Sequence, residues 1–311
     1  MMIPPDVVGI DVSKHTLDIF DATLGRAERV DNTPEAAADL ARRLSKPARF
    51  AVFEATGRYD VALRLALQAQ GVVHARVNPG QARDFAKAAG FLAKTDAVDA
   101  RMLARLGQAL RPRPAEPRDP VRDRLARLHK RRDQLVAVRK QERTRRAEAG
   151  QDPDIALDID RHLTWLDQEI DTLEDRVRAL IAQAAELERD RRLISSVPGV
   201  GPNVSATLLA LVPELGQRSP KAIAALVGLA PFNHDSGQMR GQRAIRGGRR
   251  RVREALYMAA VAASRSNSRF AATYKALRSA GKPPKLALIA VARKIIITAN
   301  AVLRDQRPFV A

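Results

Sequence analysis

Four carboxylates in the first third of the sequence could together bind a divalent cation. Asp11 interrupts the β-branched run VGIDVS, and Glu54 lies near the end of the apolar segment FAVFEAT. A charged side chain in a half-buried strand costs free energy unless something compensates it. Asp96 and Asp99 are three residues apart in KTDAVDARMLA, so they share one face if this segment is helical. Oxygen ligands suit Mg²⁺ or Mn²⁺, and two such ions could serve phosphodiester chemistry.

Each of these carboxylates also has an ordinary structural explanation. Asp11 could end a strand and cap a turn. Asp96 and Asp99 could be an N-cap and an early-helix acid that the helix dipole favours. Taken singly, each residue fits this explanation. The four together, in this order on a pattern of strands and helices, favour metal binding.

A second group of residues that could carry out chemistry lies in the last third of the sequence. Ser236 and Gly237 precede a segment with seven arginines between Arg240 and Arg253. The serine could belong to a turn beside a phosphate-binding surface, or it could be a nucleophile for a phosphodiester. His234 could transfer a proton or could be an ordinary surface-loop histidine. Arginines at a helix N-terminus are unfavourable unless an anion binds there. We therefore expect nucleic-acid contacts from Arg240, Arg243, Arg246, Arg249, Arg250 and Arg251.

The segment LISSVPGVGPNVSATLLALV, residues 193–212, has the form of a helix-hairpin-helix. Gly199 and Gly201 permit left-handed backbone geometry in its turn. The amides before the second helix could bind phosphates of a DNA backbone without reading its sequence. An ordinary turn between two helices is the alternative.

The composition of the chain suits a polyanionic partner. The 311 residues include 54 lysines and arginines, and the net charge is +19. Nucleic acid is the commonest polyanion that such a protein meets. Cysteine is absent, which excludes disulfides, thiolate catalysis and cysteine-ligated zinc. We expect no signal peptide and no stretch long and apolar enough to span a bilayer, and therefore a cytoplasmic protein without membrane contact.

Strands and helices alternate over residues 6–110, where they must position the four carboxylates. Alternating or β-branched runs predict strands, and amphipathic runs with helix-start or helix-stop signals predict helices. This pattern indicates an α/β layer fold. The expected strands are residues 7–13, 16–22, 27–33, 48–56 and 72–78, and the expected helices are residues 33–44, 59–71 and 80–110.

The remainder of the sequence predicts mainly helices. Residues 111–120 contain four prolines and cannot continue a helix. Next along the chain comes a helix that carries Leu125, Leu128, Leu135 and Val138. A heptad seam follows this helix, and the segment AGQDPD could turn the chain between the two. A helical hairpin, an intermolecular coiled coil and one long core helix all fit this pattern. The seam comprises Leu163, Leu166, Ile170, Leu173, Val177, Leu180, Ala184 and Leu187.

Several motifs resemble one known family. GIDVSK, FEATGRYD and KTDAVDARMLA resemble the DEDD, RuvC-like domain of the Piv/MooV-type transposases, the IS-one-ten insertion-sequence family. LVGLAP, the following Ser-Gly pair and a Gly-Arg turn before an alanine-rich helix resemble the C-terminal domain of the same family. The resemblance covers essentially the whole chain, and the helical middle is its least specific part. It implies a ribonuclease-H-like fold, a Mg²⁺- or Mn²⁺-binding tetrad of Asp11, Glu54, Asp96 and Asp99, and a catalytic serine at Ser236.

We therefore expect an α/β plus α chain in three parts. Residues 1–112 would form the RuvC-like, ribonuclease-H-like DEDD domain. Residues 113–192 would form a linker and a helical coiled-coil region. Residues 193–311 would form a mainly α transposase domain that contains the helix-hairpin-helix and the catalytic serine.

The expected function is DNA transposition or recombination. Ser236 would attack a DNA phosphate and form a covalent link that conserves bond energy for rejoining. The resemblance further implies a structured guide RNA from the element itself, which pairs with donor and target DNA, and synapsis predicts a dimer or tetramer. One alternative is a RuvC-like hydrolytic nuclease in which water is the nucleophile. The other is a DNA-bridging protein without enzymatic activity.

Overall fold

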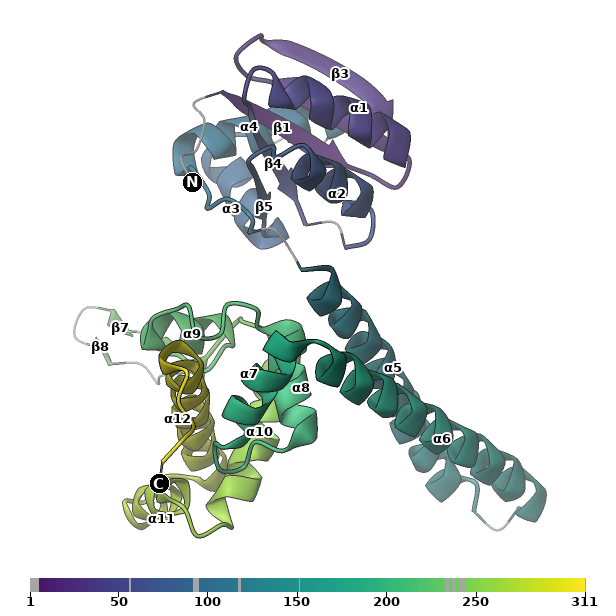
Figure 1. Ribbon diagram of the computed structural model, residues 1–311, viewed down its shortest axis with the longest axis vertical. Helices are drawn as coiled ribbons and strands as arrows, with labels where there is room; N and C mark the ends of the chain where they lie inside the picture. Colours follow the sequence, from purple (N-terminus) through teal and green to yellow (C-terminus); the bar gives the residue numbers. More distant parts are fainter. Residues whose placement is uncertain are drawn as a thin grey trace. The chain divides into compact units, whose positions relative to one another are not determined.

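The computed structural model describes residues 6–55, 57–91, 95–116, 119–150, 152–232, 235–236, 239–240 and 244–310. The chain divides into two compact units, Met1–Pro117 and Arg118–Ala311. The first unit is built on a β-sheet, and the second consists mainly of helices (Figure 1).

A five-stranded mixed sheet forms the centre of the N-terminal unit, with strand order β3-β2-β1-β4-β5. The first three strands form an antiparallel meander, and β1, β4 and β5 run parallel. Every expected strand is present. Their bounds are Val7–Val12 for β1, Thr16–Asp21 for β2, Arg26–Asp31 for β3, Phe50–Glu54 for β4 and His74–Val77 for β5.

Helices cover both faces of this sheet. The even-numbered apolar residues of β1 pack with α1, Pro34–Ser45, and α2, Val61–Ala69. The opposite face packs with α3, Pro79–Ala88, and α4, Asp96–Leu110. The single helix expected over residues 80–110 was wrong, because α3 ends at Ala88 and Gly90 adopts a left-handed conformation with φ +76°.

Two long helices, α5 (Pro120–Glu148) and α6 (Pro153–Gln183), form a hairpin within one chain. Leu135 of α5 forms a buried cluster with Leu166, Ile170 and Leu173 of α6. Among the three expected arrangements of the heptad seam, the structure therefore has the helical hairpin. The predicted length of the seam was wrong. Helix α6 ends at Gln183 because Ala184 is extended, and Leu187 lies on the next helix and packs into the C-terminal core.

Six further helices form the core of the C-terminal unit: α7 (Ala185–Ser195), α8 (Pro202–Leu211), α9 (Pro220–Leu226), α10 (Arg250–Ser264), α11 (Arg269–Ser279) and α12 (Pro284–Asp305). Their alanine-rich sequences permit close approach, as in the packing of α10 against α12. Two pairs of short strands, which the sequence did not predict, lie between α9 and α10. Pro231–Phe232 (β6) pairs with Ala244–Ile245 (β9), and Asp235–Ser236 (β7) pairs with Met239–Arg240 (β8).

Helix α12 corrects one expectation from the sequence. It is 22 residues long, with a segment of mean hydropathy 1.9, so it is long and apolar enough to cross a membrane by length and composition. Many of its apolar residues, including Val291, Ile295 and Ile296, are buried within the helical core. Buried Asn300 accepts a hydrogen bond from the Gly216 amide and donates one to the Arg218 carbonyl. The burial of its side chains explains the apolar composition of α12 as that of a core helix.

Candidate functional site

A row of charged side chains crosses the sheet of the N-terminal unit. Strand register pairs Arg29 with Asp18 and Asp18 with Asp11. The parallel pairing of β1 with β4 then places Glu54 beside Asp11. Residues that are directly opposite on neighbouring strands project from the same face. Two of the four predicted tetrad residues are therefore neighbours in one row, on a rigid part of the fold.

Helix α4 lies directly over this face of the sheet. A Cβ atom added to Gly9 would lie 2.0 Å from the carbonyl oxygen of Ala100, so the helix approaches β1 as closely as glycine allows. Asp11 is two residues after Gly9 and projects from the same face. Asp96 and Asp99 both lie in the first turn of α4. The helix thus brings the second half of the predicted tetrad toward the first.

The electrostatic environment of Asp11 reflects this convergence. Its pKa is raised to about 6, first by burial and then by the negative charges of Asp99, Asp96, Asp18 and Glu54. Like charges disfavour the ionised carboxylate. All three other predicted tetrad residues therefore act on Asp11. A bound cation would remove the repulsion that they cause.

Asp18 is a fifth carboxylate of this region, and the sequence analysis missed it. Its side chain is only 7% exposed. Its Oδ1 accepts a hydrogen bond from Arg29 Nε at 2.9 Å and lies 2.8 Å from Arg29 Nη2. Its Oδ2 is buried and has no hydrogen-bond partner among the described residues. Arg29 Nη2 also donates to Asp96 Oδ2 at 3.1 Å. The available signal was an acid inside the apolar run TLDIF, one strand away from Asp11.

The donor set of this region fits a hard divalent cation. Its donors are carboxylate oxygens, which Mg²⁺ and Mn²⁺ prefer. As the side chains stand, no three acidic or histidine side chains in the described ranges are close enough together to ligate one ion. In this arrangement Asp96 keeps its contact with Arg29. Asp11, Glu54, Asp96 and Asp99 nevertheless interact electrostatically, because the other three contribute to the raised pKa of Asp11, and these four are the residues that could hold a cation.

Ser236 lies in strand β7, where it pairs with Met239 of β8. The side chains of Ser236 and Arg240 are outside the described part of the structure. His234, Gly237 and Arg243 lie outside it entirely. The structure therefore gives the backbone setting of the predicted nucleophile and leaves its role as a prediction.

Two of the predicted nucleic-acid-binding arginines hold the fold together. Arg249 precedes α10 and donates to both carboxylate oxygens of Glu214 at 2.6 Å and to the Leu211 carbonyl at 2.9 Å. Although burial alone would raise the pKa of Glu214, the hydrogen bond from Arg249 lowers it. Arg251 donates to Asp133 of α5 at 2.6 Å. Both guanidinium groups are therefore committed to carboxylates of the same chain.

Two other arginines of this segment are available to a partner. The Arg250 side chain is 84% exposed and forms an ion pair with Glu254 on its own helix. Arg246 is exposed and has no ion-pair partner within the described ranges. Among the predicted nucleic-acid-binding arginines whose side chains the structure describes, Arg246 and Arg250 could therefore contact phosphates. Arg249 and Arg251 are instead paired with carboxylates of the same chain.

Comparison with known proteins matches both ends of the chain to transposases. Residues 8–149 match a DEDD family described as "Transposase", and residues 191–275 match the "Transposase IS116/IS110/IS902 family". The "Pilin gene-inverting protein" of Moraxella lacunata is 30% identical over 316 residues, which cover 97% of each chain. The protein belongs to this family of DEDD transposases.

Further relatives agree with this assignment. The "Pilin gene-inverting protein" of Moraxella bovis is also 30% identical over 97% of each chain. An "Insertion element IS110 uncharacterized 43.6 kDa protein" of Streptomyces coelicolor is 33% identical over 146 residues, 46% of this chain and 35% of its own. The family cleaves and rejoins DNA, and its N-terminal ribonuclease-H-like DEDD domain corresponds to the sheet that carries the carboxylate row.

The two glycines of the predicted helix-hairpin-helix have different roles in this transposase. Gly199 has φ +86°, and a Cβ atom at this position would lie 2.3 Å from the carbonyl oxygen of Ala259 on α10. Gly199 is therefore required for packing. Gly201 has φ −83° and is extended, so the expectation of a left-handed conformation at this residue was wrong. It precedes α8, next to exposed Pro202 and Asn203, and could present the first amides of α8 to a phosphate.

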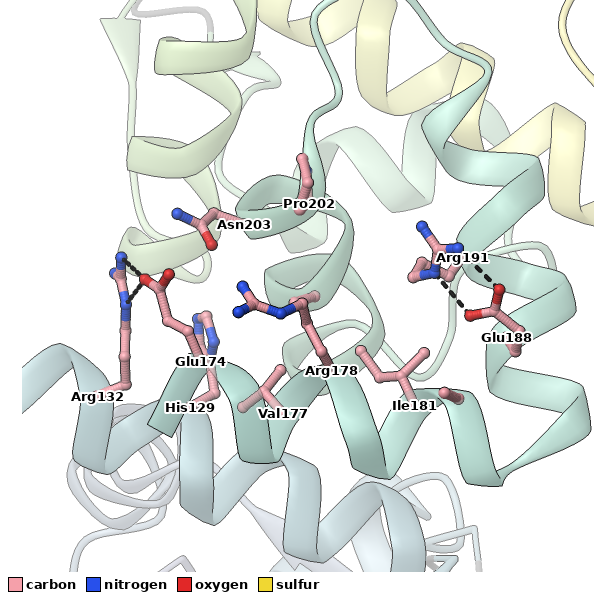
Figure 2. Close-up of a pocket in the computed structure, with 12 residues that line it drawn as sticks. His129, Arg132, Glu174, Val177, Arg178, Ile181, Glu188, Arg191, Pro202 and Asn203 are labelled. Atoms are coloured by element: carbon pink, nitrogen blue, oxygen red, sulfur yellow. Dashed lines mark hydrogen bonds and ion pairs between the residues drawn. The ribbon is translucent and has the colours of Figure 1, made fainter. Parts of the chain in front are cut away.

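A cavity of about 320 Å³ lies among α5, α6, α7 and α8 of the C-terminal unit (Figure 2). Apolar side chains such as Val177 and Ile181 form part of its wall. The ion pairs of Arg132 with Glu174 and of Arg191 with Glu188 are drawn as dashed lines in Figure 2. Because these charges compensate each other, the cavity lacks the concentration of like charge that distinguishes the carboxylate row.

Proposed function

We propose that this DEDD transposase exchanges DNA strands through Ser236, with Asp11, Glu54, Asp96 and Asp99 holding a divalent cation. The observation that carries the proposal is the set of carboxylates around Asp11, whose pKa is raised to about 6 by burial and by their negative charges. Such a concentration of negative charge is costly in a fold and is typical of a functional site. The family match at both ends of the chain supports the same reading.

The chemistry assigned to Ser236 is a pair of transesterifications. A serine hydroxyl is a weak nucleophile and needs activation. Attack of Oγ on phosphorus forms a serine–DNA phosphodiester, expels the sugar oxygen of the broken strand and passes the hydroxyl proton to that oxygen. Attack by the sugar hydroxyl of another strand reverses these steps and restores the serine. A bound Mg²⁺ or Mn²⁺ would polarise the phosphate and stabilise the leaving oxygen.

Arginine side chains and helix amides are proposed to hold the DNA backbone. Arg246 and Arg250 have exposed guanidinium groups, and Arg240 and Arg243 belong to the same segment. Their charge would stabilise a phosphate as it is attacked. The amides after Gly201 are proposed to bind backbone phosphates without reading sequence. Gly199, Arg249 and Arg251 would support this surface through packing and ion pairs.

The remaining partners follow from the resemblance and from the reaction. A structured guide RNA would pair with donor and target DNA, and the net charge of +19 is compatible with it. Synapsis of two DNA partners requires a dimer or tetramer. Residues from Leu166 to Leu173 already pack against α5, so the contact between protomers would use other surfaces. The Moraxella relatives are named for gene inversion, which supports strand exchange as the reaction of this chain. We place this reaction in the cytoplasm.

A strand-exchange assay on the DNA that flanks the gene tests the proposal. The flanking DNA supplies candidate element ends and any structured non-coding segment. Wild type should produce recombinant junctions, whereas Ser236→Ala should produce none and Asp11→Asn far fewer than wild type. Ser236→Ala should still bind the DNA, which serves as its folding control.

Two outcomes would favour other functions. Cleavage that survives Ser236→Ala and is lost in Asp11→Asn would make the protein a hydrolytic nuclease. If wild type neither cleaves DNA nor forms junctions, and wild type and Asp11→Asn bridge DNA equally well, the protein would instead be a DNA-bridging protein.

A further inference from the structure

A bridge of three side chains, Asp18, Arg29 and Asp96, joins the sheet to the first turn of α4. We propose that Arg29 is a positioning residue that orients the carboxylate of Asp96 for divalent-cation binding, with Asp18 as its buried anchor. This inference rests on the proposed function, because it takes the tetrad as the cation-binding site.

Asp18 is suited to be the anchor. A buried carboxylate is costly unless it is paired and hydrogen-bonded. Arg29 approaches its Oδ1 with two nitrogens, Nε at 2.9 Å and Nη2 at 2.8 Å. Because the guanidinium group is planar and rigid, contacts from two of its atoms fix its orientation. The strand register also makes Asp18 and Arg29 direct neighbours, so the backbone brings the pair together.

The contact between Arg29 and Asp96 has a different character. Both side chains are 55% exposed, and the two groups share one 3.1 Å contact between Nη2 and Oδ2. An exposed ion pair of this kind contributes little to stability. It leaves Oδ1 of Asp96 without a hydrogen-bond partner within the described ranges. A carboxylate whose described contact uses only one oxygen is held in one orientation, and partners that orient metal ligands are a regular feature of metal sites.

The location of the bridge fits this role. Asp11 and Glu54 are fixed by strand register, whereas Asp96 and Asp99 come from a helix. The two sources of ligands need a link that keeps the start of the helix in place over the strands. Asp18 lies directly opposite Asp11, so the bridge begins beside the strand ligands and ends at a helix ligand.

A competing role for Arg29 would have the opposite effect. A guanidinium group that simply neutralised Asp96 would compete with the cation, and its removal would strengthen cation binding. The contacts favour positioning, because Arg29 uses two nitrogens on Asp18 and only one contact on Asp96. Cation affinity therefore distinguishes the two roles. Removal of Arg29 weakens cation binding if Arg29 positions Asp96, and strengthens it if Arg29 only neutralises Asp96.

The test measures Mn²⁺ binding to the full chain by calorimetry or electron paramagnetic resonance, without DNA. Arg29→Ala should weaken Mn²⁺ binding about tenfold, the lower end of the range for residues that orient metal ligands. Arg29→Lys keeps the positive charge without the planar fork, so an intermediate loss is expected. Arg43→Ala is the matched control. Arg43 is 46% exposed and pairs with Glu28 on the same strand as Arg29, and its loss should leave Mn²⁺ affinity unchanged.

The outcomes separate this inference from the proposed function. Mn²⁺ affinity of Arg29→Ala within twofold of wild type, or above it, would overturn the positioning role. If Arg29→Ala fails to fold because Asp18 loses its counter-charge, Arg29→Lys decides by the same twofold criterion. Asp11→Asn is included as well. Weak binding by Asp11→Asn beside normal binding by Arg29→Ala refutes the bridge alone, whereas normal binding by Asp11→Asn refutes the tetrad as the cation site.

Discussion

Asp11 and Glu214 are both partly buried carboxylates, and their surroundings are opposite. Asp11 in the N-terminal unit lies among four other carboxylates, and its pKa is raised to about 6. Glu214 in the C-terminal unit accepts two hydrogen bonds from Arg249, and its pKa is lowered. Among the described residues no ion pair is formed with Asp11 itself, although its neighbour Asp18 is paired with Arg29, whereas Glu214 is paired directly with Arg249.

This difference separates a candidate site from a structural ion pair. A fold gains nothing from bringing like charges together, so such a group indicates a ligand of opposite charge. A paired carboxylate indicates no ligand, because its contact with a cationic side chain already compensates its charge. The same distinction divides the arginines, because Arg249 and Arg251 are paired with acids of distant segments, whereas Arg246 and Arg250 are exposed. Substitutions at the two kinds of position should therefore have different consequences.

The largest expected effect is the loss of strand exchange in Asp11→Asn. Neutralising one ligand of the tetrad should lower the rate of recombinant product formation about 10²- to 10³-fold, a loss typical of removing one group that stabilises transition-state charge. The matched variant Glu214→Gln should retain activity in proportion to its folded fraction. Activity of Asp11→Asn within tenfold of wild type would place the essential charge elsewhere.

The next largest effect is on stability in the C-terminal unit. Arg249→Ala leaves Glu214 partly buried without its partner, so we expect a loss of about 1–2 kcal/mol in the free energy of unfolding. Arg250→Ala should change the same quantity by less than about 0.5 kcal/mol, because the side chain is exposed. Urea unfolding of both variants makes the comparison. Equal effects would contradict the division of the arginines into structural and available groups.

A smaller effect of opposite sign is expected for the stability of Asp11→Asn without divalent metal. The folded pKa of Asp11, about 6, lies above its ordinary value of 3.8. Between these values the folded state binds more protons than the unfolded state, so wild type loses stability as the pH rises from about 4 to 6. In Asp11→Asn this pH-dependent loss of stability is absent. After a discount for partial exposure, it should be about 1 kcal/mol more stable at pH 8 and equal to wild type below pH 4.

Urea unfolding in the presence of a chelator measures this difference across the pH range. A variant that is less stable than wild type at pH 8 would mean that Asp11 is already compensated in the fold.

The smallest effect concerns DNA binding by the exposed arginines. Arg246→Ala and Arg250→Ala should each weaken binding across sequences and reduce the slope of log affinity against log salt by about 1. Binding titrations at several salt concentrations give the slope. An unchanged slope in both variants would remove these two side chains from the DNA interface.

Local sequence patterns were enough to predict the five strands, including those on which Asp11 and Glu54 lie. Alternation fixed the five strands, and acids within apolar runs identified Asp11 and Glu54. Asp18 carries the same signal, but its meaning depends on the register of β1 against β2, which the sequence did not specify. The spacing of Asp96 and Asp99 predicted that they share a helix face, but it did not predict the break that places them in the first turn of α4.

The C-terminal unit was harder to predict because its contacts join distant segments. Arg249 pairs with a residue 35 positions away, and Arg251 pairs with one 118 positions away. No local pattern distinguishes these arginines from exposed Arg250. The apolar sequence of α12 likewise reflects burial among several helices. The heptad pattern continued through Ala184 although the helix did not, because an extended backbone at one residue is sufficient to end it.

Ser236 is proposed to form a covalent bond with DNA in a reaction that depends on the cation of the carboxylate tetrad. The most direct measurement is denaturing electrophoresis of the protein with labelled element-end DNA, followed by mass spectrometry of the linked peptide. The account predicts an adduct on Ser236 that forms only with Mg²⁺ or Mn²⁺ and is absent in both Ser236→Ala and Asp11→Asn. An adduct on another residue, or recombination by Ser236→Ala without any adduct, would contradict it.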